Sequence, residues 1–365
     1  MSTSQASETA NFGAIHLQRP LRRASARRLK CAVLGATGFV GRHLVAALSA
    51  RGDQVRCIAR PTSDISALAG LDVEVQRADF ADLPALKRAL AGVECVFHTA
   101  GVTKAFRPQE FDQGNVQTTR HLLAACVDRQ TPPQVVLVSS LAAVGPSPVD
   151  QPRTESDQPV PVSDYGRSKC AAETAARQFA GWGPISIARP PMVFGPGERD
   201  VFAIALSIAR TGLHFVPGWR ARRYSLVHVA DLAEGLLRVA EAGERLPSPG
   251  ATPDDWSKGV YFLADDEMPT YAELGRMMGR ALGRRTRVVM MPPRSIYVAA
   301  GFNAVWSRLI GRPAALNFDK AREGLAGSWT CRAAKAHREL GWAPEAKLEQ
   351  RLSETMNWCR EAGWI

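Results

Sequence analysis

From residue 29 onwards, short β-rich runs of apolar residues alternate with longer segments that have helical character. The runs are bounded by Gly, Pro or Asp, which predicts strands. The segments between them are long enough for crossover helices, so the pattern predicts an α/β fold with a Rossmann-type, doubly wound parallel sheet. The expected strands are LKCAVL (29–34), VRCIA (55–59), VEVQRA (73–78), ECVFHTA (94–100), QVVLVSS (134–140) and ISIAR (185–189).

After residue 190 the regular alternation fades. Pro/Gly-rich stretches at 190–197 and 247–253 are followed by helical patterns at 271–282 and 332–340. We therefore expect a smaller, partly helical C-terminal lobe that binds the substrate.

One apolar segment of this lobe, IYVAAGFNAVWSRLI (296–310), has two interpretations. Asn303, Ser307 and Arg308 interrupt it, and it is shorter than the roughly eighteen residues that a membrane span needs. It is either a helix packed on the core or a helix that lies on a membrane surface or covers an apolar pocket. The second interpretation includes peripheral membrane contact.

Composition narrows the class of protein. The chain has 365 residues, of which 45% are hydrophobic, enough for one large α/β domain or a nucleotide-binding domain with a smaller lobe. Its seven cysteines are scattered without a CxxC pair, which disfavours a disulfide framework or a zinc ribbon and indicates a reducing compartment. We expect a cytoplasmic location.

The net charge of +11 is partly local. Residues 1–30 carry one acid, Glu8, and lack the apolar run of a secretory signal peptide. We interpret them as a disordered basic tail or, alternatively, as a mitochondrial transit peptide. No aromatic-interleaved basic surface or recognition motif points to nucleic acid. The basic residues of this segment are Arg19, Arg22, Arg23, Arg27, Arg28 and Lys30.

A glycine-rich loop, GATGFVG, directly follows the first expected strand and opens the helical segment GRHLVAALSA. Its glycines, Gly35, Gly38 and Gly41, leave bare backbone where a pyrophosphate can approach the N–H groups of a helix N-terminus. Together with the basic first segment and the change of pattern after residue 190, this loop divides the chain into three parts. They are a basic extension (1–28), an NAD(P)-binding domain (29–190) and a substrate lobe (191–365), some of whose elements return to the core.

The end of the second strand bears on which nicotinamide cofactor is used. NAD-binding folds place a carboxylate here to accept from the ribose hydroxyl, whereas this chain offers Ala59 and Arg60. A guanidinium can bind a 2′-phosphate with paired donors, so NADP(H) is favoured over NAD(H). The alternative is that Arg60 is a solvated surface arginine.

Tyr165 and Lys169 lie four positions apart in DYGRSK (164–169), which places them on one helical face. An ammonium group near the phenol would stabilise phenolate and lower the pKa of Tyr165 from its ordinary value of about 10. Because YxxxK is common in helices, this spacing alone does not establish a catalytic pair.

Many further motifs agree in order, and with them the chain resembles the extended short-chain dehydrogenase/reductase family over almost all of residues 30–365. The shared motifs are GATGFVG, ADFADL with Asp79, HTAG (98–101), NVQTT beginning at Asn115, VSS (138–140), YGRSK, RPPMVFGPG (189–197), HVADLAEG (228–235), AAKAHRELGWAP (333–344) and TMNWCREAGW (355–364).

The resemblance implies a catalytic set. Ser140 would be the catalytic hydroxyl, Tyr165 the acid/base, and Lys169 the residue that lowers the pKa of Tyr165 and holds the nicotinamide ribose. Asn115 would assist a proton relay. The family likeness also implies a homodimer. The cofactor contacts that it implies are Gly35, Thr37, Gly38, Phe39, Val40, Gly41, Arg60, Asp79, Phe80, Ala100, Tyr165, Lys169 and Pro190.

The substrate lobe departs from the sugar-nucleotide branch of that family. Met192 stands where that branch usually has Asn, and Tyr224 where it has Arg, with Arg222 and Arg223 one or two positions out of register. RPPMVFGPG and VRCIAR instead look like the branch of 3β-hydroxysteroid dehydrogenases and dihydroflavonol reductases, which implies a bulky apolar alcohol or ketone. Met192, Tyr224 and Arg223 are the candidate substrate residues.

Two other functions stay open. An NDP-sugar epimerase or dehydratase would hold NAD tightly, which Ala59 and Arg60 disfavour. A cofactor-sensing regulatory protein without catalysis is disfavoured because Tyr165 and Lys169 are both present.

Three residues suggest other chemistry but favour structural roles. His98 and His228 have no carboxylate or cysteine at ligand spacing, so we expect no metal site. Cys170 follows Lys169 on the next helical position and is expected to pack in the core.

Overall fold

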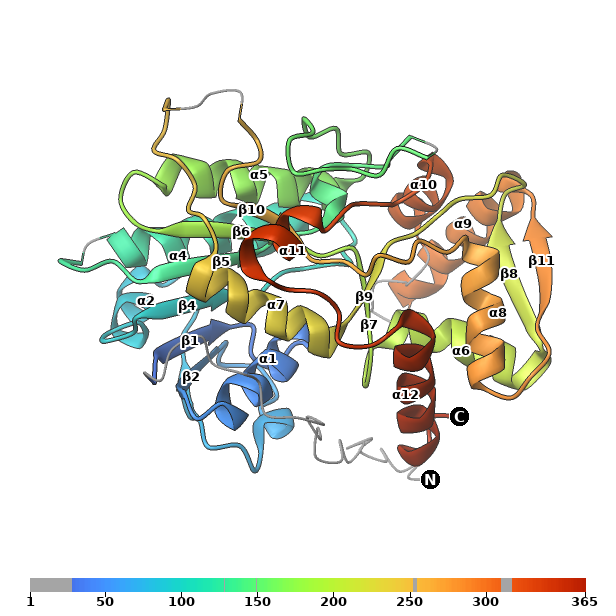
Figure 1. The fold of residues 1–365 in the computed structure, drawn as a ribbon, viewed down its shortest axis with the longest axis horizontal. Helices are drawn as coiled ribbons and strands as arrows, with labels where there is room; N and C mark the ends of the chain where they lie inside the picture. The colour runs from blue at the N-terminus through green and yellow to red at the C-terminus, as the bar shows by residue number, and fades with distance from the viewer. Residues whose placement is uncertain (1–27, 128, 149, 252–254, 310–316) are drawn as a thin grey trace.

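The computed structural model describes residues 28–127, 129–148, 150–251, 255–309 and 317–365. Its centre is a seven-stranded parallel sheet in the order β10-β6-β5-β4-β1-β2-β3 (Figure 1). The predicted Rossmann-type fold class is confirmed. The strands are β1 (Lys30–Leu34), β2 (Gln54–Ala59), β3 (Glu74–Arg77), β4 (Cys95–His98), β5 (Gln134–Val138), β6 (Ile185–Arg189) and β10 (Val260–Phe262).

The chain reverses its direction of travel across the sheet between β1 and β4. From β1 it moves outwards to β2 and β3, then returns to the other side of β1 as β4. The loops that follow β1 and β4 meet there, since a Cβ added at Gly35 would lie 2.6 Å from the Ala100 nitrogen. Gly35 also has φ +83°, which favours glycine. Ligands of doubly wound sheets bind at such a switch point.

Helices cover both faces of the sheet, and each face has its own core. The apolar residues of α2, α4 and α5 pack on one face, and those of α1, α7 and α11 pack on the other. A short α3 leads through a π-helical turn (Asp112–Gln117) into α4, and 3₁₀ turns occur at Ser66–Leu68 and Leu141–Ala143. The helices are α1 (Phe39–Ala50), α2 (Leu83–Ala89), α3 (Pro108–Phe111), α4 (Thr118–Val127), α5 (Asp164–Phe179), α7 (Val229–Ala242) and α11 (Ala334–Leu340).

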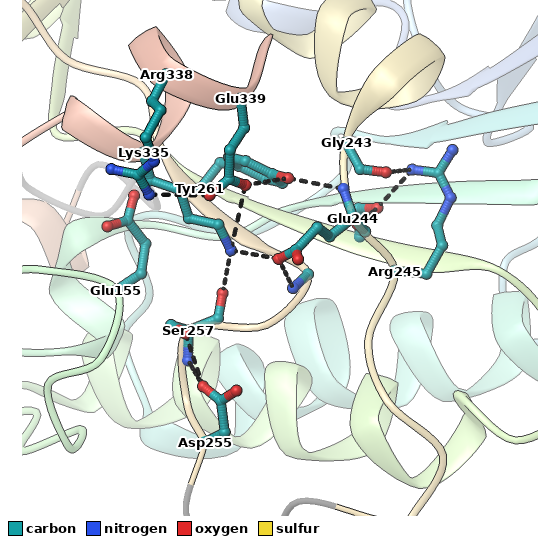
Figure 2. Close-up of polar contacts among 12 residues, drawn as sticks. Glu155, Gly243, Glu244, Arg245, Asp255, Ser257, Tyr261, Lys335, Arg338 and Glu339 are labelled. Carbon is teal, nitrogen blue, oxygen red and sulfur yellow. Dashed lines mark hydrogen bonds and ion pairs between the residues drawn. The ribbon is translucent and has the colours of Figure 1, made fainter.

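A polar network fastens α11 to the edge strand β10 (Figure 2). Lys335 donates from Nζ to the Glu244 carboxylate (2.7 Å) and to the Ser257 carbonyl (2.6 Å). Tyr261 of β10 accepts from the Glu244 N–H (2.7 Å) and donates to the Glu339 carboxylate (3.0 Å). Residues far beyond 190 in the chain thus complete the sheet.

The C-terminal lobe has a separate apolar core, built largely from α6, α8 and α12. Two small parallel sheets, β7–β9 and β8–β11, accompany these helices. The elements of the lobe are α6 (Arg199–Thr211), α8 (Tyr271–Ala281), α9 (Pro293–Leu309), α10 (Phe318–Ala326), α12 (Leu348–Glu361), β7 (Met192–Phe194), β8 (Leu213–Pro217), β9 (Leu226–His228) and β11 (Arg287–Met291).

Two expectations about segments need separate mention. The basic extension falls almost entirely on residues 1–27, which lie outside the described residues. Among the helices of the described residues, α9 included, none has the length and apolar character needed to cross a bilayer.

Candidate active site

The glycine loop between β1 and α1 fits a pyrophosphate. Helix α1 begins after Gly38 with no side chain capping its first N–H groups, so they are available to an anion. A Cβ at Gly41 would lie 2.0 Å from the Gly35 carbonyl oxygen, and one at Gly38 would lie 3.2 Å from it. A side chain at Gly41 would therefore close the cradle. Thr37, Phe39 and Val40 border it and are half-buried.

At the end of β2, Ala59 is buried and Arg60 is exposed. The Arg77 guanidinium donates to the carbonyls of Arg60 (3.2 Å), Pro61 (2.7 Å) and Ser63 (3.2 Å), which fixes the loop that follows β2. Within the described residues, the Arg60 guanidinium itself has no hydrogen bond or ion pair. It therefore remains available to an anionic ligand.

The loop after β3 holds the other expected adenine-side contacts. Asp79 is exposed and accepts from the Ala81 N–H (3.0 Å), while Phe80 packs partly against the sheet core. The Phe80 carbonyl accepts from His121 (3.1 Å), so this loop is tied to α4.

Ser140 follows β5 at the carboxyl edge of the sheet. The Leu141 N–H donates to the Pro190 carbonyl (2.9 Å), so the β5–β6 ladder continues past the strand ends. The Ser140 hydroxyl accepts from the Ala142 N–H (3.1 Å) and starts a 3₁₀ turn. Both contacts hold Ser140 on a rigid part of the fold.

Tyr165 lies in the first turn of α5, close to this serine. Ser163 caps α5 by accepting from the Gly166 N–H (2.9 Å). A Cβ at Gly166 would lie 2.4 Å from the Ala142 carbonyl, so the helix lies directly against the 3₁₀ turn. The structure thereby brings the Tyr165 phenol near the Ser140 hydroxyl, which opposes the rise of the Tyr165 pKa.

Lys169 lies one turn further along α5 and is buried. Its Nζ donates to the Val138 carbonyl (2.8 Å). A Cβ at Gly101 would lie 3.0 Å from Asn115 Oδ1 and 3.5 Å from Lys169 Nζ, so both side chains reach the loop after β4. Burial lowers the pKa of Lys169 to about 8, against the opposing effect of the Glu173 carboxylate.

Asn115 belongs to the π-helical turn that precedes α4. Its amide accepts from the Val102 N–H (2.7 Å) and donates to the Val102 carbonyl (3.0 Å) and to the Ser168 hydroxyl (2.8 Å). The side chain therefore joins the loop after β4 to α5. Single π-turns occur frequently at functional sites.

The electrostatic expectation for Tyr165 differs from what the structure shows. Burial raises the pKa of Tyr165, and the Lys320 charge and the nearby Ser140 hydroxyl oppose this rise. Lys169 directs its ammonium group to a backbone carbonyl instead. Spacing on one helical face did not determine which cation acts on the phenol.

Helix α10 contacts the start of α5, which sequence reasoning missed. Lys320 Nζ lies 5.2 Å from the centroid of the Tyr165 ring and pairs with Glu323 (2.7 Å). Asp319 accepts from the Tyr165 N–H (3.3 Å), and Ser163 donates to Glu323 (2.5 Å). Asn317 signals the start of α10 in the sequence, but no local pattern indicates a contact 155 residues away.

The three predicted substrate residues do not gather at one place. Tyr224 is 7% exposed and lines a cavity of about 100 Å³, where its ring lies 5.3 Å from that of Tyr271. Arg223 lines a different cavity of about 270 Å³ and donates to the Met268 carbonyl (3.0 Å). Met192 is half-buried on β7 against the lobe core.

The two histidines form hydrogen bonds with neighbouring residues of the protein. His98 shares a hydrogen bond with Thr119 (3.0 Å), and burial lowers its pKa to about 3. His228 caps α7 by accepting from the Ala230 N–H (3.3 Å). Cys170 is half-buried. Across the described residues, no three His, Cys, Asp or Glu side chains are grouped so that they could hold a metal.

Residues 31–252 match the model of the NAD dependent epimerase/dehydratase family. The chain belongs to this family. It is 31% identical over 336 residues to a ceramide reductase of Caulobacter vibrioides, covering 92% of this chain and 95% of that protein. It is 30% identical over 353 residues to sterol demethylase protein B of Methylococcus capsulatus, covering 91% and 99%.

Solved structures agree on the fold. MoeE5 in complex with UDP-glucuronic acid and NAD superposes with a TM-score of 0.70 at 24% identity, covering 91% of this chain and 99% of MoeE5. The family and the relatives make the protein an NAD(P)-dependent enzyme that acts on CH–OH or related groups.

Proposed function

We propose that the protein is an NADP(H)-dependent oxidoreductase that interconverts a secondary alcohol and a ketone on a bulky hydrophobic substrate, such as a sterol or another polycyclic lipid. The proximity of Tyr165 and Ser140 at the carboxyl edge of the sheet supports this type of reaction. The names of the relatives support the substrate class, since they include a ceramide reductase and a sterol demethylase protein.

The proposed reaction moves one hydride and one proton. A bound nicotinamide supplies the hydride acceptor for alcohol oxidation and the hydride donor for ketone reduction. Tyr165 takes the proton of the alcohol oxygen during oxidation and returns it during reduction. Ser140 donates a hydrogen bond to the same oxygen and stabilises the charge that develops there.

Lys169 and Asn115 have supporting roles in this proposal. Lys169 keeps positive charge near the sheet edge where the cofactor ribose is expected, and its pKa of about 8 leaves it largely protonated at neutral pH. Asn115 holds the loop after β4 against α5 through Ser168, and by that route positions the proton relay.

Arg60 is the basis for NADP(H). Because it is exposed at the end of β2 and no acid occupies that place, a 2′-phosphate can approach it. We expect Arg60→Ala to weaken NADP⁺ binding about tenfold to a hundredfold while NAD⁺ binding changes little. Equal effects on both cofactors would show that Arg60 does not contact the 2′-phosphate.

The first experiment mixes the protein with NADP⁺ or NAD⁺ and a panel of 3β-hydroxysterols, other polycyclic alcohols and UDP-sugars, and follows net formation of reduced cofactor. Net NADPH formation with a polycyclic alcohol is the expected result. Conversion of a UDP-sugar without net reduction, by protein that purifies with bound NAD, would instead identify a sugar-nucleotide epimerase or dehydratase.

A further inference from the structure

Exposed apolar side chains are concentrated on the C-terminal lobe. Ten large apolar residues of the described chain are exposed, and seven of them lie between residues 215 and 318. Scattered single residues of this kind are ordinary, whereas a concentration marks an interaction surface. The seven are Phe215, Trp219, Met290, Tyr297, Val298, Phe302 and Phe318.

Helix α9 presents an apolar stripe to solvent. Tyr297, Val298, Gly301 and Phe302 recur at the spacing of one helical face, with Arg294 at its N-terminal end, and Phe302 is 76% exposed. The opposite side of the helix is already used, since Ile296 and Ala300 pack with Ala321 of α10. One face of α9 therefore packs against the protein, and the opposite face has no partner in the described chain.

The stripe continues onto neighbouring elements. Phe318 of α10 lies beside it, because a Cβ at Gly301 would be 3.7 Å from the Phe318 ring. Met291 of β11 packs against the inner side of α9, and its carbonyl accepts from the Gly218 N–H (2.8 Å). Trp219 instead lines a cavity with Met290, on the other face of the small sheet from Phe215. Figure 1 shows α9, β8 and β11 together, at the end of the molecule remote from the seven-stranded sheet.

The small sheet adds an outward face of mixed character. In the β8–β11 register Phe215 lies opposite Val289, and alternation places Arg287 on the same face, while the exposed Met290 points to the other face. Met291 shares the face of Phe215 at the end that packs against α9. Phe215 is 48% exposed. Apolar and cationic side chains therefore share this face.

The segment that forms β11 and α9 is strongly basic, whereas the acids Asp319 and Glu323 of the neighbouring α10 are paired with Arg322 and Lys320. Residues 274–318 contain eight arginines and no aspartate or glutamate. Arg284, Arg285, Arg287 and Arg294 are exposed, and in the described residues their guanidinium groups have no hydrogen bond or ion pair. A basic segment that exposes apolar side chains suits the boundary between the headgroups and acyl chains of an anionic bilayer.

We propose that this surface, formed by Phe215, Tyr297, Val298, Phe302 and Phe318 with the arginines named above, binds anionic membranes peripherally. A second copy of the chain suits it less well. A two-fold interface over the surface would place arginines against arginines with no acids from 274–318 to offset them. This proposal of membrane binding does not depend on the proposed oxidoreductase reaction.

The test is sedimentation of the full chain with two kinds of vesicle, phosphatidylcholine alone and phosphatidylcholine mixed equally with phosphatidylglycerol. We expect binding to the anionic vesicles that weakens with added salt. Val298→Ser combined with Phe302→Ser should weaken it about tenfold or more, because the stripe loses its two most exposed side chains. Trp182→Ser, which removes an equally exposed aromatic from the sheet domain, should leave binding unchanged.

The basic extension needs its own control, because it also attracts anionic lipid. A full-length variant with Arg19, Arg22, Arg23 and Arg27 changed to Gln should keep most of the binding. Loss of binding in this variant, with none in the α9 variant, would overturn the proposal. So would loss of dimer in the α9 variant with vesicle binding intact, or absence of binding by the parent protein. Melting temperature and NADP⁺ binding of each variant show that it is folded.

Discussion

In the described part of the chain, a lysine ammonium lies over a tyrosine ring at Tyr165 and again at Tyr261. Lys320 Nζ is 5.2 Å from the centroid of Tyr165, and Lys335 Nζ is 4.6 Å from that of Tyr261. Both tyrosines have a raised pKa with burial as the main cause. The two clusters differ in what the phenol oxygen contacts.

The Tyr261 hydroxyl is fully engaged within the protein (Figure 2). It accepts from the Glu244 N–H and donates to the Glu339 carboxylate. Burial and the bond to Glu339 raise the pKa of Tyr261 and favour the protonated phenol, whereas the Glu244 N–H opposes them. The Tyr165 hydroxyl instead lies near the Ser140 hydroxyl, and both Ser140 and Lys320 oppose the rise of its pKa. The comparison teaches that the partner of the phenol oxygen, rather than a neighbouring lysine, separates a structural tyrosine from a candidate catalytic one.

Removing each hydroxyl should break the comparison most clearly. Tyr165→Phe is expected to reduce turnover by about 10²-fold to 10⁴-fold because it removes the proposed acid/base, with cofactor binding nearly unchanged. Tyr261→Phe should leave turnover near that of the parent but lower the free energy of unfolding by about 1–3 kcal/mol, since the Glu244 N–H loses its acceptor.

Turnover assays and denaturant unfolding of both variants measure these effects. An active Tyr165→Phe enzyme would refute the proposed mechanism. A Tyr261→Phe enzyme of normal stability would show that the network around Lys335 contributes little to stability.

The buried Lys169 gives a pH-dependent signature in stability. Its pKa in the folded protein is about 8 against 10.5 for an exposed lysine, so the unfolded chain holds this proton more tightly. Between these two pH values the folded protein releases the proton first, and the cost of burying the charge disappears as pH rises. Stability should therefore increase relative to a variant without this amine, by about 3 kcal/mol in all.

Denaturant unfolding of the parent and of Lys169→Met between pH 7 and pH 10.5 tests this expectation. The difference between their unfolding free energies should be constant below pH 8 and then move in favour of the parent. Parallel curves over the whole range would show that Lys169 is not perturbed by burial. Titrations of other groups cancel in this difference.

Local patterns predicted the parts of the molecule that depend on neighbours in sequence. The six predicted strands are present because each is a β-rich run between turn residues. Gly35 and Gly41 were identifiable because the chain must pass close to its own backbone there. The seventh strand, β10, was missed because a three-residue run carries almost no periodicity.

Contacts between distant segments were not predictable, and some motifs have a structural explanation. In HVADLAEG, His228 caps α7, and Asp231 forms a buried ion pair with Arg351 of α12 (2.6 Å). Arg189 of RPPMVFGPG pairs with Glu173 of α5 (2.6 Å). Lys320 could not be placed beside Tyr165 because its helix reaches α5 only through the packing of the lobe.

The contact between Lys320 and the Tyr165 ring should have a smaller effect, which concerns the pKa of the phenol. If its charge acts on the phenol as the geometry indicates, Lys320→Met should raise the apparent pKa of Tyr165, because the phenolate loses a nearby positive charge. Arg322→Met removes an exposed cation from the same helix and should leave that pKa unchanged. Ultraviolet titration of each variant, with the matching Tyr165→Phe background subtracted, isolates this one phenol.

An equal shift in both variants would mean that helix α10 acts through its overall charge or its fold. A shift confined to Lys320→Met would make Lys320 a positioning residue for the acid/base, supplied by the lobe that the sequence assigns to the substrate.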